Sequence, residues 1–150
     1  MKSQKRVVGD MVRIDLGEGI HSYARVLDKD LYAFYDCRAQ EDPSIALIAA
    51  NHILFKVAAM RYAITRGHWK VIGHAPLEAA LLKPPLQFMQ DILRPDQFSI
   101  YENGKMRSAT REECLGLERV AAWDPEHVED RLRDHYAGRP NKWVESLEMN

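Results

Sequence analysis

The 150-residue chain lacks the features that mark several large classes of protein. Its two cysteines, Cys37 and Cys114, form no Cys-x-x-Cys pair and have no histidine beside them at metal-ligand spacing. The longest apolar run, residues 45–50, is far shorter than the ~20 residues that a membrane helix needs. No stretch near the start combines basic residues with an apolar run, as a secretory signal does. These absences predict a cytoplasmic protein with reduced thiols and no membrane partner.

Charge of one sign is not in excess either. The formal net charge is −1, and the apolar and charged fractions, 46% and 29%, are ordinary for a globular protein. Such a chain has no global field that would attract nucleic acid or an anionic membrane, so we expect neither as a partner. The charge is uneven, however, because from Thr110 onward ten acidic residues stand against six Lys and Arg, a local net charge of −4.

No catalytic grouping is recognisable. The sequence has no Gly-x-Ser-x-Gly elbow, no phosphate-binding loop and no dinucleotide fingerprint. Adjacent carboxylates such as Glu112 and Glu113 diverge on helices and strands alike, unlike the opposed pair of a general acid–base site. Among six histidines only His127 and His135 share a predicted helix, and about two turns, or ~12 Å, separate them. We therefore predict a protein that is not an enzyme and has no metal and no cofactor.

What the chain does contain is a well-patterned segment, Asp10–Arg38, that predicts three short antiparallel strands. Apolar and polar residues alternate from Asp10 to Leu16 with the period of two that a half-buried strand produces. Two tight turns follow, the first of which uses glycine to reach positive φ. The predicted strands and turns are Asp10–Leu16, Gly17–Gly19, Ser22–Leu27, Asp28–Asp30 and Leu31–Cys37.

The aromatic residues of this segment allow two interpretations. A small curled sheet carrying Tyr23, Tyr32, Phe34 and Tyr35 could stack the bases of a nucleic acid. A stacking platform normally lies in a groove of Lys and Arg, and here the nearby basic residues are matched by carboxylates. We therefore favour the core for these rings, and keep a small barrel-type nucleic-acid-binding or adaptor module as the alternative function.

The middle of the chain predicts further short elements. Ile53–Ile64 is apolar without a clean period, which fits a buried strand or a short helix, and we favour the strand. Thr110 and Glu113 form a capping box, so a short helix should begin at Thr110. The other predicted elements are strands at Trp69–His74, Phe88–Ile92, Phe98–Tyr101 and Leu117–Trp123, a helical turn or two within Pro76–Leu82, a hairpin turn at Glu102–Lys105 and a loop at Gln40–Ser44.

One main helix is expected near the end of the chain. Asp124 suits the N-cap, Pro125 the first helical position, and Gly138 the stop. Residues Val128, Leu132 and Tyr136 recur every four positions and define one apolar stripe.

Together these patterns predict an α+β, mainly β fold: a curled antiparallel sheet or small barrel-like meander with one main C-terminal helix. A single domain should span residues 1–150, with a core from about residue 8 to 144. Trp69 and Trp123 should anchor this core. Trp143 follows the helix, and we expect it to fold back onto the domain rather than remain exposed for a partner.

Three stretches carry a resemblance to a known family. They are VGDMVRIDLGEGIHSYARVL (Val8–Leu27), ILFKVAAMRYAITRGHWKVIG (Ile53–Gly73) and LERVAAWDPEHVEDRLRDHYAG (Leu117–Gly138). In hydrophobic pattern, glycine placement and the contexts of Trp69 and Trp123, the chain resembles the immunity protein 26 family of bacterial polymorphic toxin systems. The resemblance implies a mostly β domain that binds and neutralises a cognate protein toxin in the producing cell. It implies no catalytic residues.

If the resemblance holds, the acidic C-terminal segment is the first candidate for contact with a basic patch of the toxin. The next candidates are two loops, Glu18–His21 and Glu41–Asp42. A third class of function, an enzyme whose site is assembled from distant residues such as Arg61, His74 and Glu118, stays open at this stage. The predicted partner-binding residues are Glu126, Glu129, Asp130, Asp134, Glu18, His21, Glu41 and Asp42.

Overall fold

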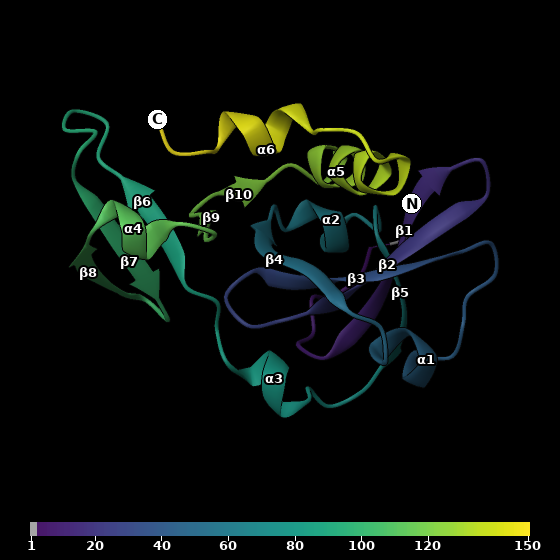
Figure 1. Ribbon diagram of the computed structural model, residues 1–150. Coiled ribbons are helices and arrows are strands. Elements are labelled where there is room, and N and C mark those ends of the chain that lie inside the picture. Colours follow the sequence, from purple (N-terminus) through teal and green to yellow (C-terminus); the bar gives the residue numbers. More distant parts are fainter. Residues whose placement is uncertain (1–2) are drawn as a thin grey trace.

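The computed structural model of the protein describes residues 3–150 (Figure 1). The strands of this part are β1 (Asp10–Gly17), β2 (Ile20–Val26), β3 (Leu31–Ala39), β4 (Ile53–Ala59), β5 (Lys70–His74), β6 (Gln87–Gln90), β7 (Phe98–Glu102), β8 (Lys105–Ala109), β9 (Glu118–Arg119) and β10 (Ala122–Trp123). The helices are α1 (Ile45–Ala49), α2 (Tyr62–Thr65), α3 (Ala79–Leu82), α4 (Arg111–Cys114), α5 (Pro125–Ala137) and α6 (Lys142–Ser146). The fold is therefore α+β and mainly β, with α5 as the main C-terminal helix, as the sequence predicted.

The strands form two open sheets. A six-stranded main sheet has the order β10-β4-β3-β2-β1-β5, and a four-stranded small sheet has the order β8-β7-β6-β9. Neither sheet closes into a barrel, so the predicted barrel-like closure is not found. Each sheet is also mixed rather than purely antiparallel, because the returning segment supplies β9 parallel to β6 and β10 parallel to β4. That segment, residues 115–123, links the two sheets in space (Figure 1).

The meander β1-β2-β3 is confirmed and forms the centre of the main sheet. Met11 pairs with Arg25 and Val12 with Ala24 across β1 and β2, which places Ala24 and Arg25 on opposite faces. The turn between these strands takes positive φ at Gly17 (93°), Glu18 (55°) and Gly19 (75°). Glycine adopts this region without strain, which is why the sequence signal for the turn was reliable.

One face of the main sheet carries the largest core, which α5 covers. Helix α5 ends at Gly138, whose φ of 68° is the left-handed conformation expected of a glycine cap. Asp124 occupies the N-cap position, but its side chain makes no capping hydrogen bond, because it accepts one from Tyr62 instead. The fully buried members of this core include Val12, Ile14, Tyr32, Phe34, Trp69, Val128 and Leu132.

The three tryptophans lie where the sequence predicted. Trp69 and Trp123 are 0% and 4% exposed in the core. Trp143 folds back: its ring stacks on His127 with 3.5 Å between centroids, and its Nε1 donates to Asp130 Oδ2 at 3.0 Å. The tail after α5 therefore packs on the domain.

The opposite face of the main sheet buries an arginine. Arg25 is fully buried among residues packed under α1 and α3, and all five of its N–H donors are directed at acceptors. Its guanidinium thereby ties β2 to β3 and to the chain that leaves β5. The acceptors are Gly9 O (2.8 Å), Ala75 O (2.8 Å), Pro76 O (2.7 Å), the Tyr35 hydroxyl (3.1 Å) and the Glu78 carboxylate (3.3 Å).

Several predicted boundaries were wrong. The stretch Ile53–Ile64 is half strand and half helix, since β4 ends at Ala59 and α2 begins at Tyr62. The strand predicted at Leu117–Trp123 is two short strands, one in each sheet. Helices α1 and α6 were not predicted; each has a side-chain N-cap, Ser44 and Asn141 respectively, and is too short to show a period of 3.6.

The small sheet has its own core under α4. Phe88, Phe98, Ile100 and Cys114 are buried there, and the capping box of Thr110 and Glu113 starts α4 as predicted. The strand predicted to reach Ile92 ends at Gln90, because the Asp91 carboxylate accepts the backbone N–H groups of residues 93 and 94 at 2.9 Å each and turns the chain.

Candidate partner-binding surface

Helix α5 carries four of the predicted partner-binding residues, and the structure divides them by exposure. Glu129 lies on the buried side, where its Oε2 accepts from Trp69 Nε1 at 3.0 Å and lies 2.7 Å from His68 Nε2. Arg133 adds a third contact at 3.7 Å from Oε1. Glu129 therefore stabilises the contact between α5 and the segment before β5, and little of its carboxylate is available to a partner.

Glu126 is exposed in the first turn of α5 and belongs to a cluster with Tyr62. The Tyr62 hydroxyl contacts the carboxylates of Asp124 and of Glu126, the latter at 2.8 Å. Hydrogen bonding to Asp124, with a smaller effect of Glu126, raises the pKa of Tyr62 above its ordinary value. Sequence reasoning missed this contact, since the partners are more than 60 residues apart.

Asp130 and Asp134 are partly exposed and are paired within the C-terminal segment. Asp130 accepts from Arg133 Nη1 at 3.0 Å in addition to the Trp143 indole. Asp134 accepts from Asn141 Nδ2 at 2.9 Å and lies 3.2 Å from Arg139. These carboxylates still contribute negative charge to the α5 surface, but each is partly offset by a neighbouring arginine.

The two loops of the prediction meet at one end of the main sheet. His21 pairs with Ala39 across β2 and β3, which places the turn containing Glu18 close to the chain that leads to Glu41. Asp42 links the loop after β3 to β1 and β2, because its carboxylate accepts hydrogen bonds from Arg13 Nη1 and from the Tyr23 hydroxyl, each at 2.8 Å. We call this region, defined by Glu18, His21, Glu41 and Asp42, the hairpin end.

Glu18 and Glu41 are the freest carboxylates of the hairpin end. Both are exposed, and within residues 3–150 neither side chain makes a hydrogen bond or an ion pair. A groove of about 380 Å³ separates Glu18 from the last turn of α5 and has Arg133 and Tyr136 in its wall. Through Glu18, the hairpin end therefore adjoins the C-terminal end of α5, the helix that carries the other four candidates.

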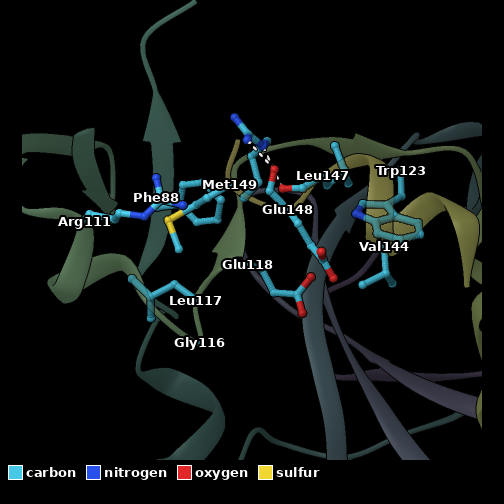
Figure 2. A pocket seen from close by; sticks show the side chains of 11 residues that line it. Phe88, Arg111, Gly116, Leu117, Glu118, Trp123, Val144, Leu147, Glu148 and Met149 are labelled. Atoms are coloured by element: carbon cyan, nitrogen blue, oxygen red, sulfur yellow. Dashed lines mark hydrogen bonds between the residues drawn. The ribbon is translucent and has the colours of Figure 1, made fainter. Parts of the chain in front are cut away.

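A larger cavity of about 400 Å³ lies between the small sheet, β10 and the chain after α6. Figure 2 shows Phe88 and Leu117 on one side of it and Trp123 and Val144 on the other. Glu118, between them, is held by two hydrogen bonds from Arg131, at 2.9 and 2.8 Å. The cavity has both apolar and charged walls, since Arg111, Arg119 and Glu148 also line it.

The three residues named for an assembled active site, Arg61, His74 and Glu118, do not come together. His74 lies on β5 at one edge of the main sheet and pairs with Asp10 at 2.7 Å. Glu118 lies in the small sheet, beyond the opposite edge, and Arg61 pairs with Asp30 at 2.8 Å. Across the described residues, no three His, Cys, Asp or Glu side chains are grouped so that they could hold a metal ion.

The stacking platform of the alternative function is also not formed. Tyr23, Tyr32, Phe34 and Tyr35 are at most 1% exposed, so the favoured assignment of these rings to the core is confirmed. The two cysteines are free thiols in separate parts of the fold, and burial raises the pKa of both Cys37 and Cys114. Of the helices from residue 3 on, none has the length and apolar character to span a bilayer.

Comparison with known proteins identifies a family. A family profile described as Immunity protein 26 matches residues 7–99. This stretch contains β6 and every strand of the main sheet except β10. Searches of curated proteins and of solved structures found no match. The matched residues cover more than half of the sequence, and the chain therefore belongs to the immunity protein 26 family.

Proposed function

We propose that this protein neutralises a cognate protein toxin in the cytoplasm of the producing bacterium by binding the toxin and sterically blocking its action. Membership of the immunity protein 26 family, over residues 7–99, is the observation that carries the proposal. The mainly β fold agrees with the mostly β domain that the family resemblance implies. A steric block would use an interface of about 1,600 Å² in total.

We further propose that the toxin approaches the side formed by the hairpin end and α5. The free carboxylates of Glu18 and Glu41 support this choice, together with the exposed Glu126 and the partly exposed Asp130 and Asp134. Negative charge on this side would accelerate association with a basic toxin surface more than it would strengthen the final complex. Glu129 is not part of this contact, because its carboxylate is used inside the fold.

Co-expression tests the function directly. The chain is produced in a bacterium together with the toxin domain encoded beside its gene, and growth is compared with that of cells that carry the toxin alone. We expect rescue of growth and a 1:1 complex on co-purification. If every neighbouring toxin domain still kills the cells and no complex forms, the proposal is wrong.

Charge reversal tests the proposed side. In the variant Glu18→Lys/Glu41→Lys, association with the toxin domain should slow by about tenfold at low salt and should depend less on ionic strength. Glu102→Lys/Glu112→Lys, which reverses two exposed carboxylates of the small sheet and of α4, is the matched control and should leave the association rate unchanged. An unchanged rate in the double variant would place the contact elsewhere.

A further inference from the structure

The loop between β6 and β7 exposes two adjacent aliphatic side chains almost completely. Ile92 is 94% exposed and Leu93 is 90% exposed, whereas the next most exposed large hydrophobic residue of the described chain, Leu82, is 67% exposed. Isolated apolar residues on a protein surface are common. Two neighbouring side chains that contact almost nothing in their own chain are better explained by a partner that covers them.

The loop that presents these side chains is internally braced. Its two ends are joined by a hydrogen bond from Asp91 N to Gln97 O at 3.0 Å, and the Asp91 carboxylate caps the turn that Ile92 and Leu93 form. Because the loop is already ordered, a partner that binds it pays little conformational entropy. The remaining braces are Gln97 N to Arg94 O (2.9 Å), Gln90 Nε2 to Pro95 O (2.8 Å) and Arg94 N to Asp91 Oδ1 (2.9 Å).

An arginine without a partner in the described part of its own chain follows the aliphatic pair. Arg94 is exposed, and its guanidinium makes no hydrogen bond, ion pair or ring contact within residues 3–150. Most other arginines of the protein are paired or stacked, for example Arg119, which lies over Phe88 and donates to Leu147 O at 2.8 Å. Arginine is enriched in binding hot spots, and the guanidinium of Arg94, unpaired among the described residues, would pair with a carboxylate of the partner.

The loop shares one edge of the molecule with the C-terminal helices. In Figure 1 the β6–β7 loop, α6 and α5 border the upper edge of the molecule, with the loop at its left end and the β1–β2 hairpin at its right end. Residues 91–97 also lie inside the stretch that matches the immunity family, whereas α5 and α6 lie outside it.

We propose that Ile92 and Leu93 are the apolar anchor of the complex, and that they insert into an apolar recess of the toxin with a carboxylate at its rim for Arg94. This inference rests on the proposed function and names the contact that holds the toxin after the acidic side has attracted it. The anchor acts on the dissociation rate, since buried apolar contacts must be broken before the partner leaves.

The test compares the wild-type chain with the double variant Ile92→Ser/Leu93→Ser, using an inactivated form of the toxin domain that passes the co-expression test. Because both side chains lie outside the core, the variant should unfold at the same temperature as the wild type. Its affinity should fall by about 100-fold or more, mostly through faster dissociation, if both side chains are buried in the complex. Arg94→Glu should also weaken binding, by about tenfold.

Leu82→Ser is the matched control, because it removes an exposed leucine of α3, on the lower side of the molecule in Figure 1. It should leave the affinity unchanged. If the wild type binds the toxin and the double variant binds within about threefold of it, the anchor proposal is wrong while the proposed function stands. A wild-type chain that dimerises through this loop, with toxin binding unchanged in the variant, would also overturn it. If no toxin domain binds the wild type, both proposals fail.

Discussion

Replacing Arg25 by methionine tests how the main sheet is held to the chain that follows β5. The side chain is fully buried, and its five N–H groups are all directed at acceptors. Methionine fills a similar space but donates no hydrogen bond. The substitution therefore leaves the carbonyl groups of Ala75 and Pro76 without their donor, and Gly9 O keeps only its bond from Ala75 N at 3.2 Å. The packing around the site changes little.

The expected loss of stability depends on which of these acceptors can form hydrogen bonds with water once the arginine is removed. A hydrogen bond to a charged group contributes about 1.5–3 kcal/mol to stability. The sum over the three bonds to carbonyl groups is therefore an upper limit on the loss of stability, and the net loss is smaller. Removal of the arginine also relieves the desolvation of its own charge, and truncation of buried charged groups typically destabilises by about 3–5 kcal/mol. We expect a fall of about 4 kcal/mol in the free energy of unfolding, which is a decrease of roughly 10 °C in Tm for a domain of this size.

Urea and thermal unfolding followed by circular dichroism would measure this change. Two controls separate the carbonyl contacts from the ion pairs: Glu78→Gln, whose parent side chain is 50% exposed, and Arg13→Met, which removes a partly exposed pair with Asp42. Each control should change the free energy of unfolding by less than about 1 kcal/mol, as surface ion pairs do. A loss of under about 1 kcal/mol for Arg25→Met, or an equal loss for Glu78→Gln, would refute the reasoning.

Three further measurements test other contacts of the fold. Glu129→Ala should destabilise the protein by about 1–3 kcal/mol in urea unfolding, because it leaves the indole N–H of Trp69 unpartnered in the core; no loss would show that this contact is dispensable. Thr110→Ala removes the capping box with Glu113 and should lower the free energy of unfolding by about 1 kcal/mol in the same assay, whereas Thr110→Ser should retain most of it. Burial raises the pKa of Tyr23 above its ordinary value of 10.0, and a group whose pKa is raised by folding stabilises the fold below the unfolded-state value. Stability should therefore be retained up to about pH 10 and lost above it, and Tyr23→Phe should reduce the tyrosinate absorbance that appears only in that range.

The local parts of the fold were predictable because their signals are local. The Gly17-Glu18-Gly19 turn, the Thr110 capping box and the Gly138 stop each depend on residues within four positions of one another, and all three are found. Helices α1 and α6, of five residues each, were missed because they do not complete enough turns to show a period, whereas the even shorter α4 was found through its capping box.

The candidate surface was only partly accessible to this reasoning. Charge pattern selected Glu129 and Asp130 together, since both are acidic and adjacent. Their environments differ because one helical position separates them by about 100° around α5: Glu129 turns toward Trp69, and Asp130 turns outward. Ile92 was assigned to a strand, and nothing in its neighbours showed that the Asp91 side chain would end the strand and leave Ile92 in water.

The sequence by itself therefore determined the fold class, the central meander, the main helix and the family resemblance, all of which rest on periodicity and short-range chemistry. Only the tertiary structure decided that the strands form two open mixed sheets, that Arg25 is a buried tie and that the hairpin end lies beside α5. These features depend on contacts between residues far apart in the chain, such as Arg133 Nε with Leu16 O, 117 positions away. Pairings of that kind follow from how the elements pack, and no pattern within one segment encodes them.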